Sequence, residues 1–314
     1  MKKVLAIINP ISGTGSKKNI PDLLGQAYNA SEYELFLTYT KAAGHAEELA
    51  RRAASEGYDH VIAVGGDGTV NEVARGLVGS QTALGIVPKG SGNGLARSLG
   101  LSMKSDQVIQ QLVSGRRIAI DSCELNGRPF FCTCGMGFDA AVSRTFAEAS
   151  TRGPVTYLRT MIEEYRSFKP ETYRLDINDG ERTLETEAFV LVVANATQYG
   201  NNAYIAPEAD LSDGLLDLAI IRPFPVLEAA VVLGDLMLGK LAGNKHYETE
   251  RIKSLRIERP TAGAVHIDGE PLELGTTIDI KLCPHSLHVI IPQVPAAPPP
   301  ARAAPRAGRA RPRR

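Results

Sequence analysis

The stretch that decides the fold is Val61-Ile62-Ala63-Val64-Gly65-Gly66-Asp67-Gly68-Thr69-Val70-Asn71-Glu72. Its four leading apolar residues are typical of a buried parallel strand, and the residues from Asn71 are typical of a helix start. Three glycines remove every Cβ at the turn, so backbone N–H groups and a helix N-terminus can close on a phosphate. The stretch therefore predicts a nucleotide-phosphate loop beside a metal or an acceptor hydroxyl. A purely structural strand–turn–helix corner is the alternative.

Two further loops of small residues follow expected strands in the first part of the chain. Residues Asn9–Gly15 follow a strand at Val4–Ile8, and residues Pro88–Gly94 follow a strand at Ala83–Val87. The other elements expected here are Ile20–Ala30, Tyr33–Thr38 and His45–Glu56. This alternation of strands and helices predicts an open α/β sheet, in which ligands bind at the carboxyl ends of the strands. All three loops fall at that edge.

From about Ile118 the pattern changes to short strands separated by turn signals such as Asn126-Gly127. The expected strands are Arg128–Cys134, Tyr173–Ile177, Ala188–Ala194, Leu215–Ile221, Ser254–Glu258, Ala264–Ile267 and Thr277–Leu282. Helical stretches are expected near Asp139–Phe168 and Pro225–Leu241. The second part therefore predicts a mainly antiparallel β-sandwich.

These patterns divide the chain into an α/β domain at residues 1–120 and a β-sandwich domain at residues 121–286. A last strand near 287–291 is expected to return to the first domain. Residues 293–314 are rich in Pro, Ala and Arg, so they cannot build a core and are expected to be disordered.

Composition narrows the class of partner. The formal net charge is +0, but six Arg and no acid lie between Pro295 and Arg314, which leaves the body with 29 basic and 35 acidic residues, or −6. A mildly acidic body argues against a nucleic-acid partner. The four cysteines show no metal-ligand spacing, which favours a packing role in a reducing cytosol.

The N-terminus does not indicate export. The apolar stretch within Met1–Pro10 is too short for a signal peptide, and no small-residue cleavage site follows it. No uninterrupted apolar segment is long enough to span a bilayer. We expect a soluble, cytoplasmic protein.

Five motifs in order carry a family resemblance. They are Asn9-Pro10 with its glycine loop, Gly65–Glu72, Gly90-Ser91-Gly92-Asn93, Asp210-Leu211-Ser212-Asp213-Gly214-Leu215-Leu216-Asp217 and Asp268-Gly269-Glu270. Over almost the whole body, the chain resembles the diacylglycerol-kinase-type lipid kinases, which include bacterial lipid kinases and the sphingosine and ceramide kinases. The resemblance implies a Rossmann-like nucleotide domain followed by a β-sandwich. One motif alone would be weak, because NAD kinases share the Gly-Asp-Gly-Thr loop.

The resemblance also implies ATP and Mg²⁺, and it assigns roles to residues. The nucleotide-binding residues that it implies are Asn9, Ser12, Gly13, Thr40, Gly65, Gly66, Asp67, Gly68, Thr69, Asn71, Glu72, Gly90, Ser91 and Asn93. Ser91 stands where many relatives have threonine, and its hydroxyl can still bond a phosphate. Lys89 is unusual beside that loop, where it either adds positive charge toward phosphate or is solvated.

Asp268-Gly269-Glu270 is the second chemical centre. Glycine lets the two carboxylates flank a sharp turn after a short apolar strand, although a plain hairpin turn is the alternative. In bacterial relatives the counterpart of Glu270 is the proposed base that accepts the lipid hydroxyl proton. Elsewhere in the family that role is given to the aspartate of the glycine loop, here Asp67. We expect Glu270 to be the base, with Asp268 in support and Asp67 as the rival.

A magnesium site is implied by the longest motif. Asp213, with the backbone carbonyls of Asp210 and Leu215, matches a site that is structural in bacterial relatives, and a hard cation prefers such oxygen ligands. A polar turn between strands is the alternative.

The sequence is compatible with several classes of lipid substrate. Asp139, in Gly135-Met136-Gly137-Phe138-Asp139, matches an aspartate that binds the amino-alcohol headgroup in sphingosine kinases, and it also suits a helix cap. Diacylglycerol or a similar glycerolipid, a sphingoid base, and another hydroxylated lipid all stay open.

Two other classes of function remain. One is a NAD kinase-like enzyme, and the other is a non-catalytic lipid- or nucleotide-binding protein. As partners we expect ATP and a lipid at the membrane surface, with peripheral membrane association and no nucleic acid. The oligomeric state is left open, a homodimer included. The arginine-rich tail is either a membrane anchor or a neutral extension.

Overall fold

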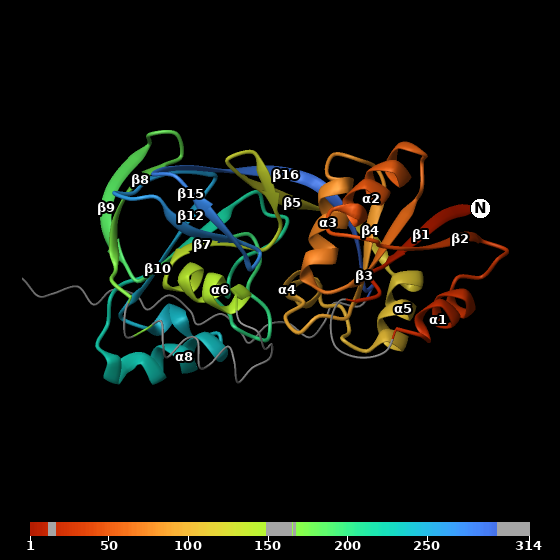
Figure 1. The fold of residues 1–314 in the computed structure, drawn as a ribbon, viewed down its shortest axis with the longest axis horizontal. Coiled ribbons are helices and arrows are strands. Elements are labelled where there is room, and N and C mark those ends of the chain that lie inside the picture. Colours follow the sequence, from red (N-terminus) through yellow and green to blue (C-terminus); the bar gives the residue numbers. More distant parts are fainter. Residues whose placement is uncertain (12–16, 149–164, 166–167, 294–314) are drawn as a thin grey trace, which may run out of the picture.

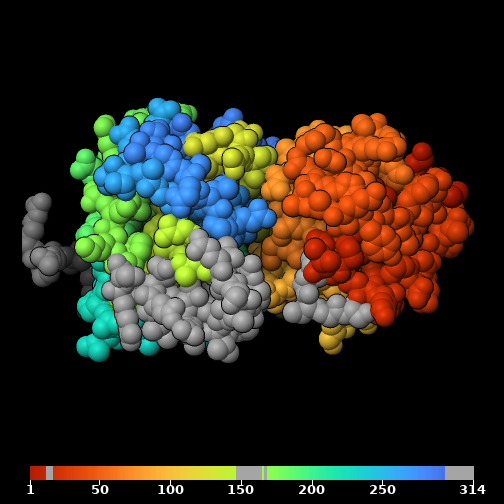
Figure 2. All heavy atoms as spheres, in the orientation of Figure 1, coloured from red at the N-terminus to blue at the C-terminus, as the bar shows by residue number. Residues whose placement is uncertain are grey.

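The computed structural model describes residues 1–11, 17–148, 165 and 168–293. The chain forms two lobes that lie side by side, the N-terminal α/β part and the sandwich part (Figures 1 and 2). The predicted tail beyond residue 293 and most of the helix expected near 139–168 lie outside the described residues.

The first lobe is an α/β layer structure, as predicted. Its elements are β1 (Lys2–Ile8), α1 (Ile20–Ala27), β2 (Tyr33–Tyr39), α2 (His45–Ser55), β3 (His60–Gly65), α3 (Asp67–Leu77), β4 (Ala83–Pro88), α4 (Gly94–Ser98) and α5 (Ser105–Ser114). The strands are parallel in the order β2-β1-β3-β4. Helices α2 and α3 cover one face and α1 and α5 the other (Figure 1). This double cover explains why β4 is buried at every position.

The second lobe is an antiparallel β-sandwich, as predicted. Its elements are β5 (Arg116–Leu125), β6 (Arg128–Phe130), β7 (Thr133–Gly137), α6 (Phe138–Glu148), β8 (Glu171–Ile177), β9 (Arg182–Ala188), β10 (Val190–Ala194), β11 (Leu216–Ile221), η1 (Val226–Glu228), α8 (Ala229–Met237), η2 (Leu241–Gly243), β12 (Tyr247–Ile252), β13 (Ser254–Glu258), β14 (Gly263–Ile267), β15 (Glu270–Leu274) and β16 (Thr277–Ile291). One layer has the order β12-β11-β10-β7-β14-β15. The other contains β16, β13, β8 and β9 with β5 and β6.

Strand β16 joins the two lobes. It is 15 residues long and pairs with β5 on both sides of an irregularity between Cys283 and Leu287. Its far end lies parallel to β4, with Val289 opposite Leu84. Figure 1 shows it crossing from the sandwich to the parallel sheet, so one sheet runs from β2 to β9.

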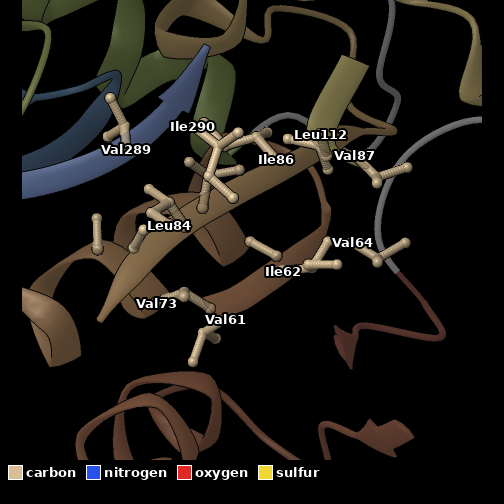
Figure 3. Close-up of a cluster of buried hydrophobic side chains, with 14 of the residues drawn as sticks. Val61, Ile62, Val64, Val73, Leu84, Ile86, Val87, Leu112, Val289 and Ile290 are labelled. Carbon is tan, nitrogen blue, oxygen red and sulfur yellow. The ribbon is translucent and has the colours of Figure 1, made fainter. Parts of the chain in front are cut away.

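The core of the first lobe includes the end of β16. Figure 3 shows buried side chains from β3, β4, α3, α5 and β16 in one cluster, among them Val61, Ile62, Val64, Val73, Leu84, Ile86, Val87, Leu112, Val289 and Ile290. A second core fills the space between the sandwich layers, and a third lies between the six-stranded layer and the helices α6 and α8. The two lobes are therefore not independent folding units, since β16 contributes to both cores.

Several predicted element bounds were wrong. The expected strand Arg128–Cys134 is divided into β6 and β7, because Asp268 accepts hydrogen bonds from the amides at the break. The strands expected at 277–282 and 287–291 are one strand, and α3 begins at Asp67 rather than Asn71. The sequence patterns did not predict α4, α5, β5, β9, β12 and β15.

Candidate active site

The carboxyl ends of β1, β2 and β3 bring the first predicted residues together. The Asn9 backbone N–H donates to the Val64 carbonyl at 3.0 Å, and its side-chain Nδ2 donates to Oγ1 of Thr69 at 3.0 Å. The Thr40 N–H donates to the Ile8 carbonyl at 3.0 Å. Asn9, Thr40 and Thr69 therefore lie at the same edge of the sheet, where the sequence placed them. Ser12 and Gly13 lie outside the described residues.

The glycines of this edge are required by close packing between the loops. A Cβ on Gly90 would lie 2.8 Å from Cα of Gly66, and a Cβ on Gly65 would lie 2.5 Å from the side chain of Thr69. Real Cβ atoms essentially never approach so closely, so larger residues would push the loops apart. The sequence predicts that these glycines give a phosphate access to backbone N–H groups. In the structure they also allow two loops to touch.

Asp67 ties these two loops together. Its carboxylate accepts hydrogen bonds from the N–H of Asn93 at 2.9 Å and of Gly94 at 2.8 Å. Asn93 is left-handed, with a φ of 53°, and its amide side chain closes the loop onto Gly90. Both carboxylate oxygens of Asp67 are thus engaged with backbone amides, which is the geometry of a positioning residue.

Other predicted residues support the same edge. Glu72 accepts hydrogen bonds from the N–H of Gly44 at 2.9 Å and of Ala46 at 3.1 Å, so it fixes the start of α2. Asn71 is buried in α3, and Ser91 is exposed at the loop tip. Lys89, whose role was left open, donates to Ser105 at the start of α5. Burial of Lys17 lowers the pKa of its amine, and the positive charge of Lys89 lowers this pKa further.

Glu270 reaches this edge from the sandwich. Asp268 and Gly269 have φ values of 49° and 83°, so they form the tight hairpin turn between β14 and β15. Glu270 follows the turn, and its Oε1 lies 3.2 Å from the position that a Cβ on Gly68 would take. The second lobe thus places a carboxylate directly against the first turn of α3.

The surroundings of Glu270 make it more basic than an ordinary carboxylate. Although the residue reaches solvent, crowding by protein atoms desolvates the carboxylate and raises its pKa above 4.5. The positive charge of Arg75 opposes this rise, and the carboxylate of Glu72 adds to it. A raised pKa suits a group that must accept a proton.

Asp268 holds the chain rather than facing a substrate. Its carboxylate accepts hydrogen bonds from the N–H groups of Phe131, Cys132 and Thr133 at 2.8 to 3.0 Å. Burial raises its pKa to about 6, and these three bonds act in the opposite direction. The structure therefore gives Asp268 the task of fixing the hairpin that presents Glu270.

Asp139 belongs to a polar cluster that the sequence did not reveal. Its Oδ2 lies 2.9 Å from Nε2 of His266 and accepts a hydrogen bond from the Tyr199 hydroxyl at 3.0 Å. Its Oδ1 accepts the N–H of Ala140 at 2.8 Å. Gly135 leaves room for the cluster, since a Cβ there would lie 2.2 Å from Asp139 Oδ2. No local pattern indicates it, because Asp139 and His266 are 127 residues apart.

The predicted metal residues lie on a turn rich in oxygen ligands. Asp213 accepts the Leu215 N–H at 3.1 Å and pairs with Arg251 at 3.3 Å, while Asp210 accepts two bonds from Ser212. Nearby Asp217 is buried, and this raises its pKa to about 6. Among the described residues, no three His, Cys, Asp or Glu side chains converge as a metal-binding group.

The carboxylates of this turn nevertheless influence one another. Asp213 and Glu208 each raise the pKa of Asp217, so negative charge is concentrated there, with Arg251 opposing it. A divalent cation bound by carboxylate and carbonyl oxygens would relieve that repulsion.

Comparisons with known proteins agree with the two-domain fold. Residues 3–125 match the diacylglycerol kinase catalytic domain, and residues 132–291 match the YegS C-terminal NAD kinase beta sandwich-like domain. A Yersinia pestis protein named "Probable lipid kinase YegS-like" is 28% identical over 301 residues, which cover 93% of this chain and 98% of that protein. The uncharacterized protein sll0036 of Synechocystis is 28% identical over 306 residues, covering 91% of this chain and 69% of that protein.

Solved structures show the same fold. One from Bacillus anthracis str. Sterne, provisionally described as a diacylglycerol kinase, has a TM-score of 0.78 at 25% identity and covers 93% of this chain and 96% of that chain. A second from the same organism, described as a diacylglycerol kinase, has a TM-score of 0.71 at 22% identity, with 93% and 97% covered.

The chain belongs to the diacylglycerol-kinase-type lipid kinases. It is a lipid kinase, so the alternative function of a non-catalytic binding protein is excluded. Within the described residues, no helix is both long and apolar enough to cross a membrane.

Proposed function

We propose that this lipid kinase transfers the γ-phosphate of ATP to a hydroxyl of a lipid such as diacylglycerol or a sphingoid base, with Mg²⁺. The observation that carries this proposal is the position of Glu270. Its carboxylate comes from the sandwich lobe and lies against Gly68, in the glycine loop of the α/β lobe. Phosphoryl transfer depends mainly on positioning and charge neutralisation, so a base at the phosphate loop is the expected arrangement.

The residues divide the work in this proposal. The loops that end β1, β3 and β4 hold the ATP phosphates, with Thr40 lining the nucleotide site. Asp67 keeps two of these loops in register through the amides of Asn93 and Gly94. Glu270 accepts the proton of the lipid hydroxyl as the hydroxyl oxygen attacks the γ-phosphorus of ATP. Mg²⁺ on the phosphates would neutralise charge there, and a second cation at Asp213 would be structural.

The cluster around Asp139 favours an uncharged acceptor. Asp139 already has His266, Tyr199 and the Ala140 amide as partners, so it is not a lone counter-ion awaiting an ammonium group. This supports diacylglycerol or a similar glycerolipid over a sphingoid base, with Asp139 contacting the headgroup through its remaining oxygen capacity. We place the enzyme in the cytoplasm, in peripheral contact with the membrane.

The test is a transfer assay with radiolabelled ATP and Mg²⁺. Detergent-dispersed diacylglycerol, sphingosine and ceramide are offered separately, and NAD is included because the second domain resembles an NAD kinase sandwich. We expect label in diacylglycerol above all. Label in NAD with none in any lipid would contradict the proposal, as would absence of transfer by folded protein.

A further inference from the structure

The helix between β11 and β12 has an apolar face that the described residues leave uncovered. Leu227 is 90% exposed and Leu238 is 63% exposed, and Val226, Val231 and Met237 are also exposed. No atom lies within 4 Å of the position that a Cβ on Gly234 would take. We call this surface, made of Leu227, Val231, Gly234 and Leu238 with their neighbours, the α8 face.

The α8 face extends from η1 to the end of α8. Val231 and Gly234 lie in α8 and are three residues apart, while Leu227 in η1 and Leu238 at the C-cap continue the same spacing at four residues on either side. The opposite side, with Val232 and Leu236, packs on the third core. A helix that is apolar on both sides is normally enclosed by protein or lipid. Among the described residues, one side of this helix packs on protein and the other side is exposed.

Charge is almost absent from this helix. Asp235 is the one charged residue in Ala229–Met237, and its carboxylate accepts a hydrogen bond from Asn244 at 2.8 Å. At the N-terminal end, Glu228 is paired with Lys245 and lies 2.8 Å from His246. Exposed Lys240 follows the C-terminal end. The α8 face therefore presents apolar surface with a basic residue at its border, which suits a bilayer whose headgroups are partly anionic.

One short segment connects the buried side of α8 to the candidate active site. The Tyr204 N–H donates to the Leu236 carbonyl at 2.9 Å, and Gly239 packs on the Tyr204 ring. A few residues earlier, Tyr199 binds Asp139, and a Cβ on Gly200 would lie 2.9 Å from Gly92 of the nucleotide loop. Residues 199–204 thus touch α8 at one end and the candidate site at the other.

We propose that the α8 face is the surface by which this lipid kinase docks on a lipid bilayer. The proposal rests on the proposed function, because an enzyme whose acceptor resides in a membrane needs apolar surface next to its site. Figure 1 places α8 on the sandwich lobe, the lobe that carries Glu270 and Asp139. Insertion of apolar side chains, rather than charge attraction, would then provide most of the binding.

The absence of tryptophan from the chain gives a direct probe. A Leu227→Trp variant carries a single indole on the α8 face, and Leu37→Trp places one on β2, where Leu37 is 41% exposed. Vesicles of phosphatidylcholine and phosphatidylserine, with and without brominated lipid, should shift the Leu227→Trp emission to the blue and quench it. The Leu37→Trp emission should not change. Unquenched emission from Leu227→Trp on vesicles would overturn the proposal.

A binding variant separates this proposal from docking by the arginine-rich tail. The double variant Leu227→Asp/Leu238→Asp should lower vesicle binding by roughly tenfold or more, and Leu37→Asp should not lower it. Activity on detergent-dispersed lipid should persist, and wild-type binding should survive high salt. Binding that salt abolishes, and that disappears on deleting residues 294–314, would assign docking to the arginine-rich tail and contradict the proposal.

Failure of the enzymatic proposal gives a different pattern. If no lipid is phosphorylated in detergent by wild-type protein, the proposed function fails, while the quenching result still decides whether the α8 face enters a bilayer.

Discussion

The Oε1 atom of Glu270 lies 3.2 Å from the position that a Cβ on Gly68 would occupy. These residues belong to different lobes and are far apart in the sequence, so their proximity brings the two domains together at the candidate site. Gly68 is the second residue of α3, and its backbone has no positive φ that would require glycine. The glycine therefore leaves room for the carboxylate above it, since a Cβ there would require Oε1 to shift by a few tenths of an ångström.

Replacing that glycine should separate activity from stability. Gly68→Ala adds a methyl group against Glu270 and also removes a glycine from a helix, which by itself is worth up to about 1 kcal/mol of stability. We expect an unchanged or higher Tm together with a kcat that falls roughly tenfold to a hundredfold, because small misplacements of reacting groups are costly. Gly25→Ala in α1, where no atom lies within 4 Å of the new Cβ, is the matched control. Normal turnover by Gly68→Ala would show that Glu270 does not act at this point.

Asp67 should behave differently from Glu270. Asp67→Asn weakens the bonds to the amides of Asn93 and Gly94, and a poorly satisfied buried donor costs about 1–3 kcal/mol. We expect a lower Tm and a higher KM for ATP, since the hydrogen bonds that hold the two phosphate loops together become weaker. Asp106→Asn, an exposed carboxylate in the first turn of α5, should change neither. An Asp67→Asn protein with wild-type stability and ATP affinity but no turnover would instead identify Asp67 as the base.

The pH profile should report the environment of Glu270. A base must be ionised, so kcat/KM should fall as pH drops through its pKa, and desolvation places this limb above the ordinary value of 4.5. The charge of Arg75 lowers that pKa, so Arg75→Met should move the acidic limb to higher pH, whereas Arg75→Lys should leave it in place. If the acidic limb of the pH profile does not respond to the charge at position 75, that limb reports the ionisation of a group other than Glu270.

The turn at Asp213 should couple stability to Mg²⁺. For a cation that binds only the folded state, a free concentration a hundredfold above Kd stabilises by about 2.7 kcal/mol. We therefore expect Mg²⁺ to raise the Tm of the wild type and of Glu185→Ala, an exposed carboxylate change on β9, but not of Asp213→Ala. An equal response in all three proteins would make the segment an ordinary turn.

Much of the fold was predictable because its signals are local. Apolar runs such as 61–64 followed by glycine loops indicate parallel strands, and Asp268-Gly269 indicates a tight hairpin. Strand β16 was predicted as two strands, Thr277–Leu282 and 287–291, rather than as one. The structure continues the strand there, since Asp121 accepts the His285 N–H at 2.7 Å from 164 residues away.

The site was predictable in part for the same reason. Asp67 and Glu270 stand in recognisable motifs, but Arg75, Tyr199 and His266 do not. Their roles depend on which elements meet: Tyr199 approaches Asp139 across 60 residues, and Arg75 influences Glu270 from the other lobe. Likewise, the engagement of Asp268 with three backbone amides depends on the packing of β14 on β7.

The central claim is that Glu270 is the base for phosphate transfer to a lipid hydroxyl. The most direct measurement is the turnover of Glu270→Gln on detergent-dispersed diacylglycerol, beside Glu273→Gln, an exposed carboxylate change on the same strand. We predict that Glu270→Gln keeps its Tm and its ATP affinity but loses turnover by a factor on the order of 10²–10⁴, while Glu273→Gln retains wild-type turnover. Near-normal turnover by a folded Glu270→Gln protein would contradict the account.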